Sequence, residues 1–387
     1  LEGDGFYLEP NWEIAAEEAL LGLKSSFAWN LELIKLPLAW EISQGSRGLP
    51  IALLDSGLDP NFSGAAVYPG YNFVQGNRDT ADDNGHGTQV AGILKQVVPR
   101  LGIIPVKVLD EKGSGNVFDL AAGLLFAAGL HDQLYNPYPA AVINLSLGQF
   151  NSSTILRGAI RHIAEKTAAL LVAAAGNYDR PEVLYPAAYP EVIAVGAIAP
   201  AAGLPRRADY SNFGSGLDLT APGGSREFPL ESPGLPGRGR EAAGTSFAAP
   251  HVSGVINLML ARGIEPSRIG PILEASAVDL GPAGWDGDYG HGLLNAYWAL
   301  EEAVSFQVSV EKKAGGSWQQ VKTFEKPLRD GELEPFVLAP GLYRVEAWLD
   351  MGKAGLLDRG DYYYRSPPLV LDDDSQVQAH LVLAELD

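Results

Sequence analysis

Short, almost uninterrupted apolar runs alternate with longer segments of helical period through most of the chain. The short runs are rich in Val, Ile, Leu and Ala, which is typical of strands buried on both faces of a parallel sheet. These predicted strands are 49–54, 102–109, 140–145, 169–174 and 191–195. The longer segments predict helices at 36–42, 117–129 and 153–166, with two more after His86 and Ser246. This alternation predicts an α/β fold with a doubly wound, mostly parallel sheet and helices on both faces.

The two ends of the chain carry different patterns. Apolar positions between Trp12 and Lys24 predict an amphipathic helix that docks on the main domain. From about Val304 the period changes to two, which predicts a small antiparallel β-sandwich. Its expected strands are 306–310, 318–324, 336–338, 343–348, 362–364 and 377–383. The expected domains are an N-terminal extension at 1–28, a main domain at 29–303 and the β-sandwich at 304–387.

Composition and charge exclude several functions. The chain has 387 residues, which suits one large domain and one smaller one. Its net charge of −19, without clustered Lys and Arg, argues against a nucleic-acid partner. The absence of cysteine excludes disulfides, thiolate metal sites and cysteine nucleophiles. Because there is no long uncharged apolar run and no basic or apolar N-terminus, we expect no membrane span and no leader in this chain.

The segment from Gly244 to Met259 is the first candidate for chemistry. Gly244 permits a tight turn, Thr245 is a good N-cap, and Ser246 then lies at the start of a buried helix. Pro250 has no backbone N–H to donate to the carbonyl of Ser246, so helix propensity does not explain a proline at this position. Taken alone, the segment fits either a nucleophilic serine or tight helix packing.

Three other polar residues follow or precede buried elements at the same predicted sheet edge. Asp55 ends the first strand, where open α/β sheets place their sites, and it needs a partner if it is buried. His86, 31 residues further on, stands between two glycines at a helix start. It is either that partner or a turn histidine in contact with solvent. Asn177 follows the small-residue strand 169–174 and offers either an amide donor or a left-handed turn residue.

Together, these segments resemble a known family. Four blocks, in order, resemble the motif blocks of subtilisin-like serine proteases: Asp55-Ser-Gly, His86-Gly-Thr-Gln-Val-Ala-Gly, Ala174-Ala-Gly-Asn177 and Gly244-Thr-Ser246-Phe-Ala-Ala-Pro-His. The resemblance covers roughly 29–303. It includes Tyr289-Gly-His-Gly-Leu-Leu-Asn295-Ala after the Ser246 helix.

The resemblance implies a serine endopeptidase. Ser246 would attack the peptide carbonyl, His86 would move the proton, and Asp55 would orient His86. The Asn177 amide and the Ser246 backbone N–H would meet the oxyanion. An extended substrate would lie between Gly113-Ser114-Gly115 and Ser146-Leu147-Gly148, with its primary side chain beside Ala174 and Gly176.

That primary pocket would be lined by Gly, Ala and Leu, with Tyr178 and Leu184 nearby. Such a lining favours large apolar or aromatic side chains before the scissile bond. Asp179 and Glu182 lie in the same loop, and either one turned inward would favour a basic side chain instead.

Some features depart from the family. Gln89 stands where a second histidine is usual, and we expect a change in helix packing without loss of catalysis. The family's strong calcium-binding loop is not expected here, because residues 95–100 after the His86 helix carry no acidic or Asn-rich insertion. A weakly bound structural calcium is implied only at Asp218 with the carbonyls of 185–192, and the chemistry requires no cofactor.

Residues 1–28 are too short to be the inhibitory prodomain with which the family is usually made. The resemblance implies that the protein is secreted or in the cell envelope, and that its own prodomain, if one was removed, is a further partner.

Two function classes stay open. The chain is either an active endopeptidase, whose partner is a protein or peptide substrate, or a catalytically silent binding protein on the same scaffold. The β-sandwich either steadies the catalytic unit or binds carbohydrate or the cell envelope. The presence of all four polar residues of the family's motif blocks (Asp55, His86, Asn177 and Ser246) favours the active endopeptidase.

Overall fold

A computed structural model describes most of the chain. The described residues are 13–16, 29–201, 205–232, 235, 241–301, 305–327, 341–349, 362–365, 369–371 and 384–385. The chain divides into two compact units, residues 1–300 and 301–387, and each is described by itself.

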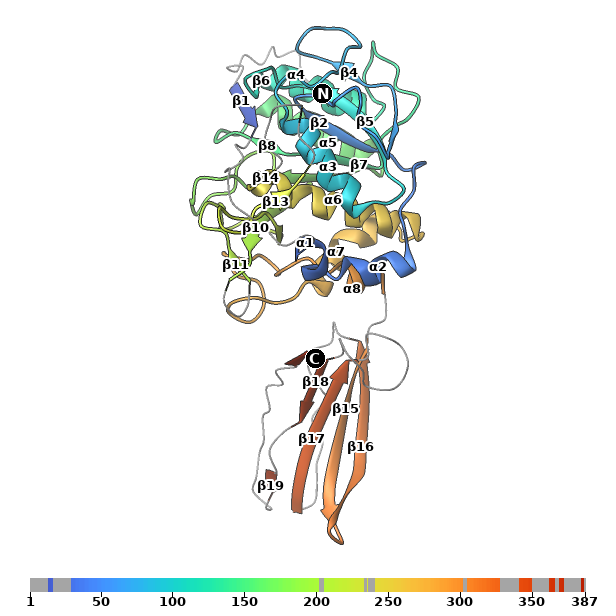
Figure 1. Cartoon of the computed structure of the whole chain (residues 1–387), viewed down its shortest axis with the longest axis vertical. Helices are drawn as coiled ribbons and strands as arrows, with labels where there is room; N and C mark the ends of the chain where they lie inside the picture. Colours follow the sequence, from blue (N-terminus) through green and yellow to red (C-terminus); the bar gives the residue numbers. More distant parts are fainter. Residues whose placement is uncertain are drawn as a thin grey trace. The chain divides into compact units, whose positions relative to one another are not determined.

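A nine-stranded sheet forms the centre of the first unit (Figure 1). Its middle strands are β2 (Ile51–Asp55), β5 (Gly102–Lys107), β7 (Val142–Leu145), β9 (Leu170–Ala174) and β10 (Val192–Ala199). The main path runs β11-β10-β9-β7-β2-β5-β3, and all pairs among the middle strands are parallel. The peripheral strands are β3 (Ala66–Val67), β4 (Tyr71–Asn72), β11 (Arg206–Arg207) and β12 (Leu219–Pro222). The predicted mostly parallel sheet is confirmed.

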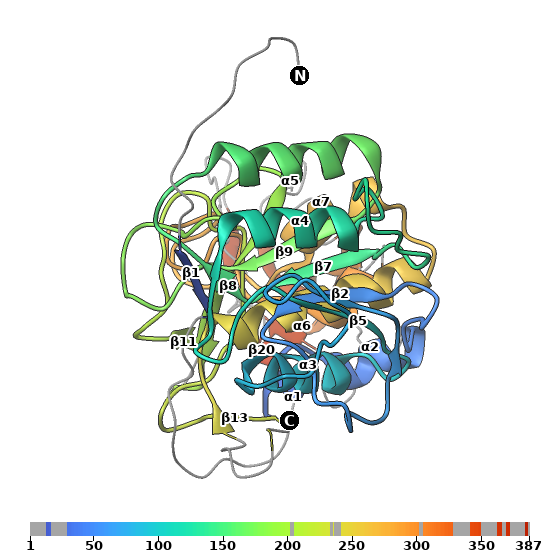
Figure 2. The same cartoon turned by 90° about the horizontal axis from the view of Figure 1, so that it is seen from above.

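Helices cover both faces of this sheet (Figure 2). On one face lie α4 (Val117–Ala127) and α5 (Thr154–Lys166), and on the other lie α3 (His86–Val97) and α6 (Thr245–Ala261). The shorter helices are α1 (Trp29–Leu33), α2 (Leu36–Ile42), α7 (Pro266–Ser276) and α8 (Ala296–Leu300). Successive side chains of β2 point to opposite faces, so Ile51 and Leu53 join one hydrophobic cluster while Ala52 and Leu54 join the other. The doubly wound arrangement follows from this alternation.

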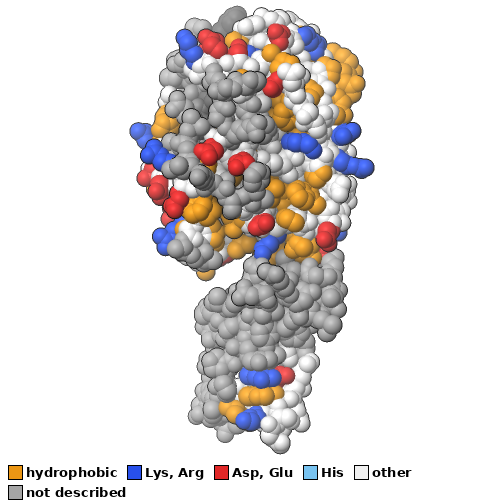
Figure 3. Space-filling model, viewed as in Figure 1, with side chains coloured by type: hydrophobic (Ala, Val, Ile, Leu, Met, Phe, Trp, Pro, Cys, Tyr) orange, Lys and Arg blue, Asp and Glu red, His pale blue; other side chains and the backbone are white. Residues whose placement is uncertain are grey.

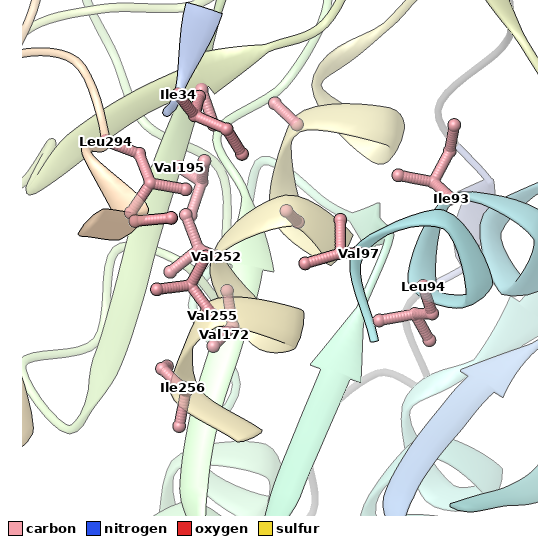
Figure 4. Packing of buried hydrophobic residues seen from close by; sticks show 14 of the residues in the cluster. Ile34, Ile93, Leu94, Val97, Val172, Val195, Val252, Val255, Ile256 and Leu294 are labelled. Carbon is pink, nitrogen blue, oxygen red and sulfur yellow. The ribbon is translucent and has the colours of Figure 1, made fainter. Parts of the chain in front are cut away.

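Helix α6 is deeply buried. Every residue from Thr245 to Met259 is buried. Val252, Val255 and Ile256 of α6 lie among side chains of α3, β9 and β10 (Figure 4). A Cβ added at Gly254 would lie 2.5 Å from Val97 Cγ1, so α3 and α6 are packed in close contact. This packing fixes the two helices whose first residues include His86 and Ser246.

The N-terminal prediction is wrong where the structure describes it. Residues Glu13–Ala16 form a strand, β1, although a helix was expected from Trp12 to Lys24. β1 pairs antiparallel with β6 (Ser114–Asn116) on one side and with β8 (Leu147–Gly148) on the other. Pairing with two strands overrides the weak helix preference of such a short segment. The rest of the predicted helix lies outside the described residues.

The second unit is all-β where it is described. Its strands are β15 (Ser305–Ala314), β16 (Ser317–Pro327), β17 (Gly341–Leu349), β18 (Tyr362–Arg365), β19 (Leu369–Leu371) and β20 (Ala384–Glu385). All their pairings are antiparallel and belong to one sheet. The strands expected at 336–338 and 377–383 lie outside the described residues.

The surface of the first unit carries both signs of charge. On the face shown in Figure 3, acidic and basic side chains of described residues are interspersed. Among the helices that the structure describes, none combines the length and apolar character needed to cross a membrane. A separate two-stranded ribbon, β13 (Leu230–Glu231) with β14 (Glu241–Ala242), leads into α6.

Candidate active site

Asp55 and His86 form a buried pair at the carboxyl edge of the sheet. Asp55 ends β2 and is 0% exposed, and Oδ1 accepts a 2.7 Å hydrogen bond from the Ser56 N–H. His86 Nδ1 lies 2.8 Å from Asp55 Oδ1 and 3.0 Å from Oδ2. Because a carboxylate accepts from Nδ1–H, neutral His86 carries its proton there and offers Nε2 as a base.

Asp82 holds the start of α3 in place. Its carboxylate accepts from the Gly85 N–H at 2.8 Å, the Thr88 N–H at 2.9 Å, the Thr88 hydroxyl at 2.6 Å and the Ser56 hydroxyl at 2.8 Å. Burial alone would raise the pKa of Asp82, but these hydrogen bonds outweigh it and hold the pKa below its ordinary value. The sequence interpretation gave Asp82 no role, although an acid just before a helix start is a recognisable signal.

Lys107, the last residue of β5, holds the turn after Asp55 through hydrogen bonds. It lies opposite Asp55 in the β2–β5 register, is 1% exposed, and donates to the Ser56 carbonyl and to Asp83 Oδ1, both at 2.6 Å. A Cβ added at Gly87 would lie 2.3 Å from the Gly57 carbonyl oxygen. The helix that carries His86 therefore packs directly on this turn. Nothing in the local sequence around Lys107 indicated a buried cation.

The start of α6 differs from the prediction in one detail. The N-cap is Gly244, at φ 156° and ψ 159°, and Thr245 is the first helical residue. Instead of capping its own helix, Thr245 donates from its N–H and its hydroxyl to Asn177 Oδ1, at 2.8 and 2.9 Å. The Thr245 hydroxyl also accepts from the Gly176 N–H at 3.2 Å. Thr245 therefore joins α6 to the loop after β9.

Those two bonds orient the Asn177 amide. With Oδ1 accepting from Thr245, Nδ2 points the other way, where it is buried and donates to no group among the described residues. A buried amide donor without an acceptor costs stability, so such a group in a native fold calls for a functional reason. Asn177 is not the left-handed residue of this loop, because that conformation belongs to Asp179 at φ 50°.

Ser246 is fixed through β8 and the residues that precede it. Its hydroxyl donates to the Ser146 carbonyl at 3.3 Å, and the Ser146 hydroxyl donates to the Ser246 carbonyl at 2.7 Å. Asn144 Nδ2 donates to the Ser146 hydroxyl, and the Ser253 hydroxyl donates to Asn144 Oδ1. This chain of hydrogen bonds runs from the interior of α6 back to its first turn.

The rings of Phe247 and His86 bring the two helix starts together, with centroids 5.7 Å apart. One turn further along α6, His251 is fully buried. Its Nδ1–H donates to the Phe247 carbonyl at 2.7 Å, which leaves Nε2 to accept from Asn30 Nδ2 at 3.0 Å. Burial lowers the pKa of His251 to about 4, although the Phe247 carbonyl acts in the opposite direction. His251 is therefore a neutral structural residue that joins α1 to α6.

Comparison with known proteins identifies this arrangement. Residues 46–292 match the Subtilase family. The chain is 34% identical over 275 residues to the thermophilic serine proteinase of Bacillus sp. (strain AK1), covering 68% of this chain and 64% of that protein. It is 33% identical over 291 residues to thermitase of Thermoactinomyces vulgaris, covering 72% of this chain and 97% of that protein. The crystal structure of a lanthipeptide protease superposes with a TM-score of 0.60 at 28% identity, covering 72% of this chain and 99% of that one.

The chain belongs to the subtilase family of serine-type endopeptidases. The members of this family need no cofactor for catalysis. In this subtilase, the two segments expected to hold substrate lie on either side of β1. Gly113 forms the turn before β6, at φ 74°, while Ser146 leads into β8.

The segment expected to line the pocket for the substrate's primary side chain has no room for a residue larger than glycine at position 176. Ala174 ends β9, and a Cβ added at Gly176 would lie 2.5 Å from Asn212 Nδ2 and 2.8 Å from Leu184 Cγ. Gly176 also has φ 114°, which disfavours any side chain. Of the expected neighbours, Leu184 is buried beside Gly176, whereas Tyr178 is 51% exposed.

The two acids near this segment, Asp179 and Glu182, are both exposed. Asp179 pairs with Arg207 at 2.9 Å, and its side chain is 58% exposed. Glu182 is exposed. The Phe150 and Tyr178 rings, from the loops after β8 and β9, lie 4.9 Å apart. This subtilase therefore presents aromatic side chains at the start of both loops, and Asp179 shares Arg207 with Asp288, which lies 3.0 Å from the Arg207 Nε.

The described residues give no direct support to a calcium site at Asp218. Asp218 Oδ2 already accepts from the Ala194 N–H at 2.7 Å, and burial raises the pKa of Asp218 despite that bond. The expected carbonyls of Tyr185, Pro186 and Tyr189 each accept a backbone N–H. Calcium needs six to eight oxygens, and the described residues contain no group of three or more His, Asp or Glu placed to hold a metal.

Proposed function

We propose that this chain hydrolyses internal peptide bonds through Asp55, His86 and Ser246, with Asn177 and the Ser246 N–H as the oxyanion donors. The observation that carries the proposal is the Asn177 amide, whose Nδ2 is buried without an acceptor among the described residues, while Oδ1 is held by Thr245. A donor held in this way costs no reorganisation when negative charge appears on a substrate oxygen.

The reaction uses these groups in turn. His86 Nε2 takes the proton from the Ser246 hydroxyl as the oxygen attacks the substrate carbonyl carbon. The Asp55 carboxylate, held on His86 Nδ1, stabilises the imidazolium that forms. The proton then passes to the leaving amine, which gives an acyl-enzyme. A water molecule, activated by His86 in the same way, releases the acid and restores Ser246.

Substrate would bind in extended form between β6 and β8, which together we call the peptide site. It would make main-chain hydrogen bonds to residues 113–115 and 146–148. Its primary side chain would lie beside Ala174 and Gly176 with Leu184. Because Asp179 is engaged by Arg207, that position favours a large apolar or aromatic side chain.

Several features stay proposals. The catalytic domain is assigned to 29–303, with 1–28 as an extension and 304–387 as a small β domain of undetermined role. A secreted or cell-envelope location and removal of a prodomain rest on the family alone. Structural calcium at Asp218 has no support from the donor set.

Hydrolysis of a denatured protein substrate tests the proposal. Ser246→Ala should abolish peptide release while circular dichroism stays unchanged, because one oxygen is removed. Ser63→Ala, at an exposed serine, is the matched control and should keep full activity. Activity of Ser246→Ala within tenfold of the control would reject Ser246 as the nucleophile.

A further inference from the structure

Lys107 is a buried cation to which the proposed reaction gives no step. It is 1% exposed, and among the residues that the structure describes no other Lys or Arg is buried. Burying an ammonium group costs stability unless the group is paired and hydrogen-bonded. A buried lysine next to the Asp55 turn therefore calls for a functional reason.

The Lys107 ammonium group joins two segments of the site. Nζ donates to the Ser56 carbonyl, in the turn after Asp55, and to Asp83 Oδ1, in the loop before α3, both at 2.6 Å. The backbone N–H groups of residues 108 and 109 donate to the Asp55 carbonyl at 2.9 and 3.3 Å. The end of β5 thus holds the main chain on both sides of the Asp55–Ser56 peptide bond, while its lysine side chain also reaches the loop that leads to the catalytic histidine.

The charge of Lys107 lies among carboxylates of unequal exposure. Asp55 and Asp82 are 0% and 8% exposed, whereas the side chain of Asp83 is 44% exposed. A buried charge acts more strongly on its neighbours than an exposed one, because less water screens it. The positive charge of Lys107 therefore disfavours a second positive charge on the His86 imidazole. The negative charge of Asp83 favours that imidazolium, but more weakly.

The other titratable groups around the start of α3 have smaller effects. His251, on α6, is buried and neutral. Asp59 and Glu111 contact residues 84–88 only through their backbone N–H and carbonyl groups, and their side chains are partly or fully exposed. Lys107 and Asp83 are therefore the pair of opposite charges whose removal should act on His86.

We propose that Lys107 is a positioning residue for catalysis, with Asp83 as its counter-charge. It fixes the turn after Asp55 against the loop before His86, and its charge keeps His86 available as a base to lower pH. The inference rests on the proposed roles of Asp55 and His86. Because Lys107 does not belong to the strands assigned to substrate, its loss should lower kcat and leave KM nearly unchanged.

Four variants separate the charge of this pair from its packing. Lys107→Met removes the ammonium group and keeps a long unbranched side chain. Asp83→Asn removes one charge and keeps Oδ1 as an acceptor, and the double variant removes both charges. Asp79→Asn makes the same isosteric change at an exposed acid earlier in the loop and is the matched control.

NMR titration of the His86 imidazole tests the effect of charge. The chains carry Ser246→Ala, so that they cannot digest themselves. Lys107→Met should raise the midpoint of the titration by about 0.5 pH unit or more, and Asp83→Asn should lower it by a smaller amount. The double variant should return toward the starting value, and Asp79→Asn should not change it.

Each result of the titration decides the inference. Unchanged midpoints, or shifts of the same sign in the two single variants, would overturn it. If Lys107→Met does not fold, Asp83→Asn alone decides: a lowered midpoint supports the inference, and a midpoint equal to that of Asp79→Asn overturns it.

Steady-state kinetics in chains that carry Ser246 test the effect on positioning. Lys107→Met should lower kcat by about tenfold or more, with KM within about twofold of the parent value. A purely structural lysine would lower the Tm and leave kcat and the His86 midpoint unchanged, which would contradict the inference. Shifted midpoints without any hydrolysis by the parent chain would keep the action of Lys107 on His86 and reject the proposed function. Hydrolysis by the parent chain with unchanged midpoints would reject the inference and keep the proposed function.

Discussion

The Ser146 hydroxyl donates a 2.7 Å hydrogen bond to the main-chain carbonyl of Ser246. In a regular helix that carbonyl would accept from the N–H four residues on, but this position is Pro250, which has none. Ser146 therefore supplies the donor that Pro250 lacks. The proline that looked out of place in the sequence frees the carbonyl of the candidate nucleophile to accept from Ser146, the residue before β8.

A double-mutant cycle tests this relationship. Ser146→Ala should destabilise the fold by about 1–3 kcal/mol, because the buried Ser246 carbonyl loses its side-chain donor. Pro250→Ala restores a backbone N–H, so the same Ser146→Ala change should cost less in that background. Unfolding by guanidinium chloride in a Ser246→Ala chain measures all four variants without self-digestion. Additive costs would show that the two residues do not share the carbonyl.

Asn177→Ala tests the oxyanion donor. We expect kcat to fall by about 10²–10³ with little change in KM, because the amide meets a charge that appears only in the transition state. Tyr178→Ala changes the next residue of the same loop, which is exposed, and should leave kcat close to the parent value. Steady-state kinetics on one peptide substrate give both constants. A rise in KM at constant kcat would instead assign Asn177 to ground-state binding.

His251 should make stability fall in mild acid. Its pKa is about 4 in the folded chain and near its ordinary value of 6.5 in the unfolded chain, so the unfolded state binds the extra proton between those values. The stability that neutral His251 contributes is thus present above pH 6.5 and is lost as the pH falls toward 4, by about 3 kcal/mol in total.

The measurement compares the free energy of unfolding of Ser246→Ala chains with and without His251→Gln from pH 7.5 to pH 4. The difference between the two chains should shrink as the pH falls, since only one of them titrates at residue 251. If the free energies of unfolding of the two chains changed in parallel with pH, His251 would not be held neutral in the folded chain.

The Asp82 carboxylate should affect the free energy of unfolding at a lower pH than His251 does. Its folded pKa lies below its ordinary value of 3.8, so its contribution is present above about pH 4 and is lost as the pH falls through the folded pKa. Asp82→Asn should cost about 3 kcal/mol at pH 7, because a neutral amide cannot accept from Gly85, Thr88 and Ser56 together. The same unfolding experiment should show the parent and variant converging below pH 4. A pH-independent difference would mean that packing, and not the carboxylate, accounts for the loss.

Substrate preference follows from the pairing of Asp179 with Arg207, which also pairs with Asp288. Matched peptides with Phe, Leu, Lys or Glu before the scissile bond should show the highest kcat/KM for Phe or Leu, by at least about tenfold over Lys. Arg207→Met removes the partner of Asp179 and should raise the relative rate for Lys. Preference of the parent chain for Lys would refute an apolar primary position.

The buried strands were predictable from sequence because each one is a short apolar run that ends at a turn. The pairing of Asp55 with His86 was anticipated because a buried carboxylate needs a partner and a glycine-flanked histidine can approach one. The functions of Lys107 and Asp82 were not predicted, since their partners come from other segments and leave no local pattern.

The errors at Thr245 and at residues 13–16 have the same physical origin. Thr245 has the right residue type for an N-cap, but Asn177 takes both of its donors. Residues 13–16 fit a helical period, but two facing strands satisfy their backbone. In both cases a contact distant in sequence outweighs a local preference.

Covalent labelling of Ser246 tests the central claim most directly. A fluorophosphonate reacts only with an activated serine, and mass spectrometry of the digested product identifies the residue. We expect the parent chain to be labelled at Ser246, and His86→Ala to be labelled far more slowly because the base is missing. No labelling of the correctly folded parent, or equal labelling rates in the parent and His86→Ala, would contradict the assignment of Asp55, His86 and Ser246 as a catalytic unit.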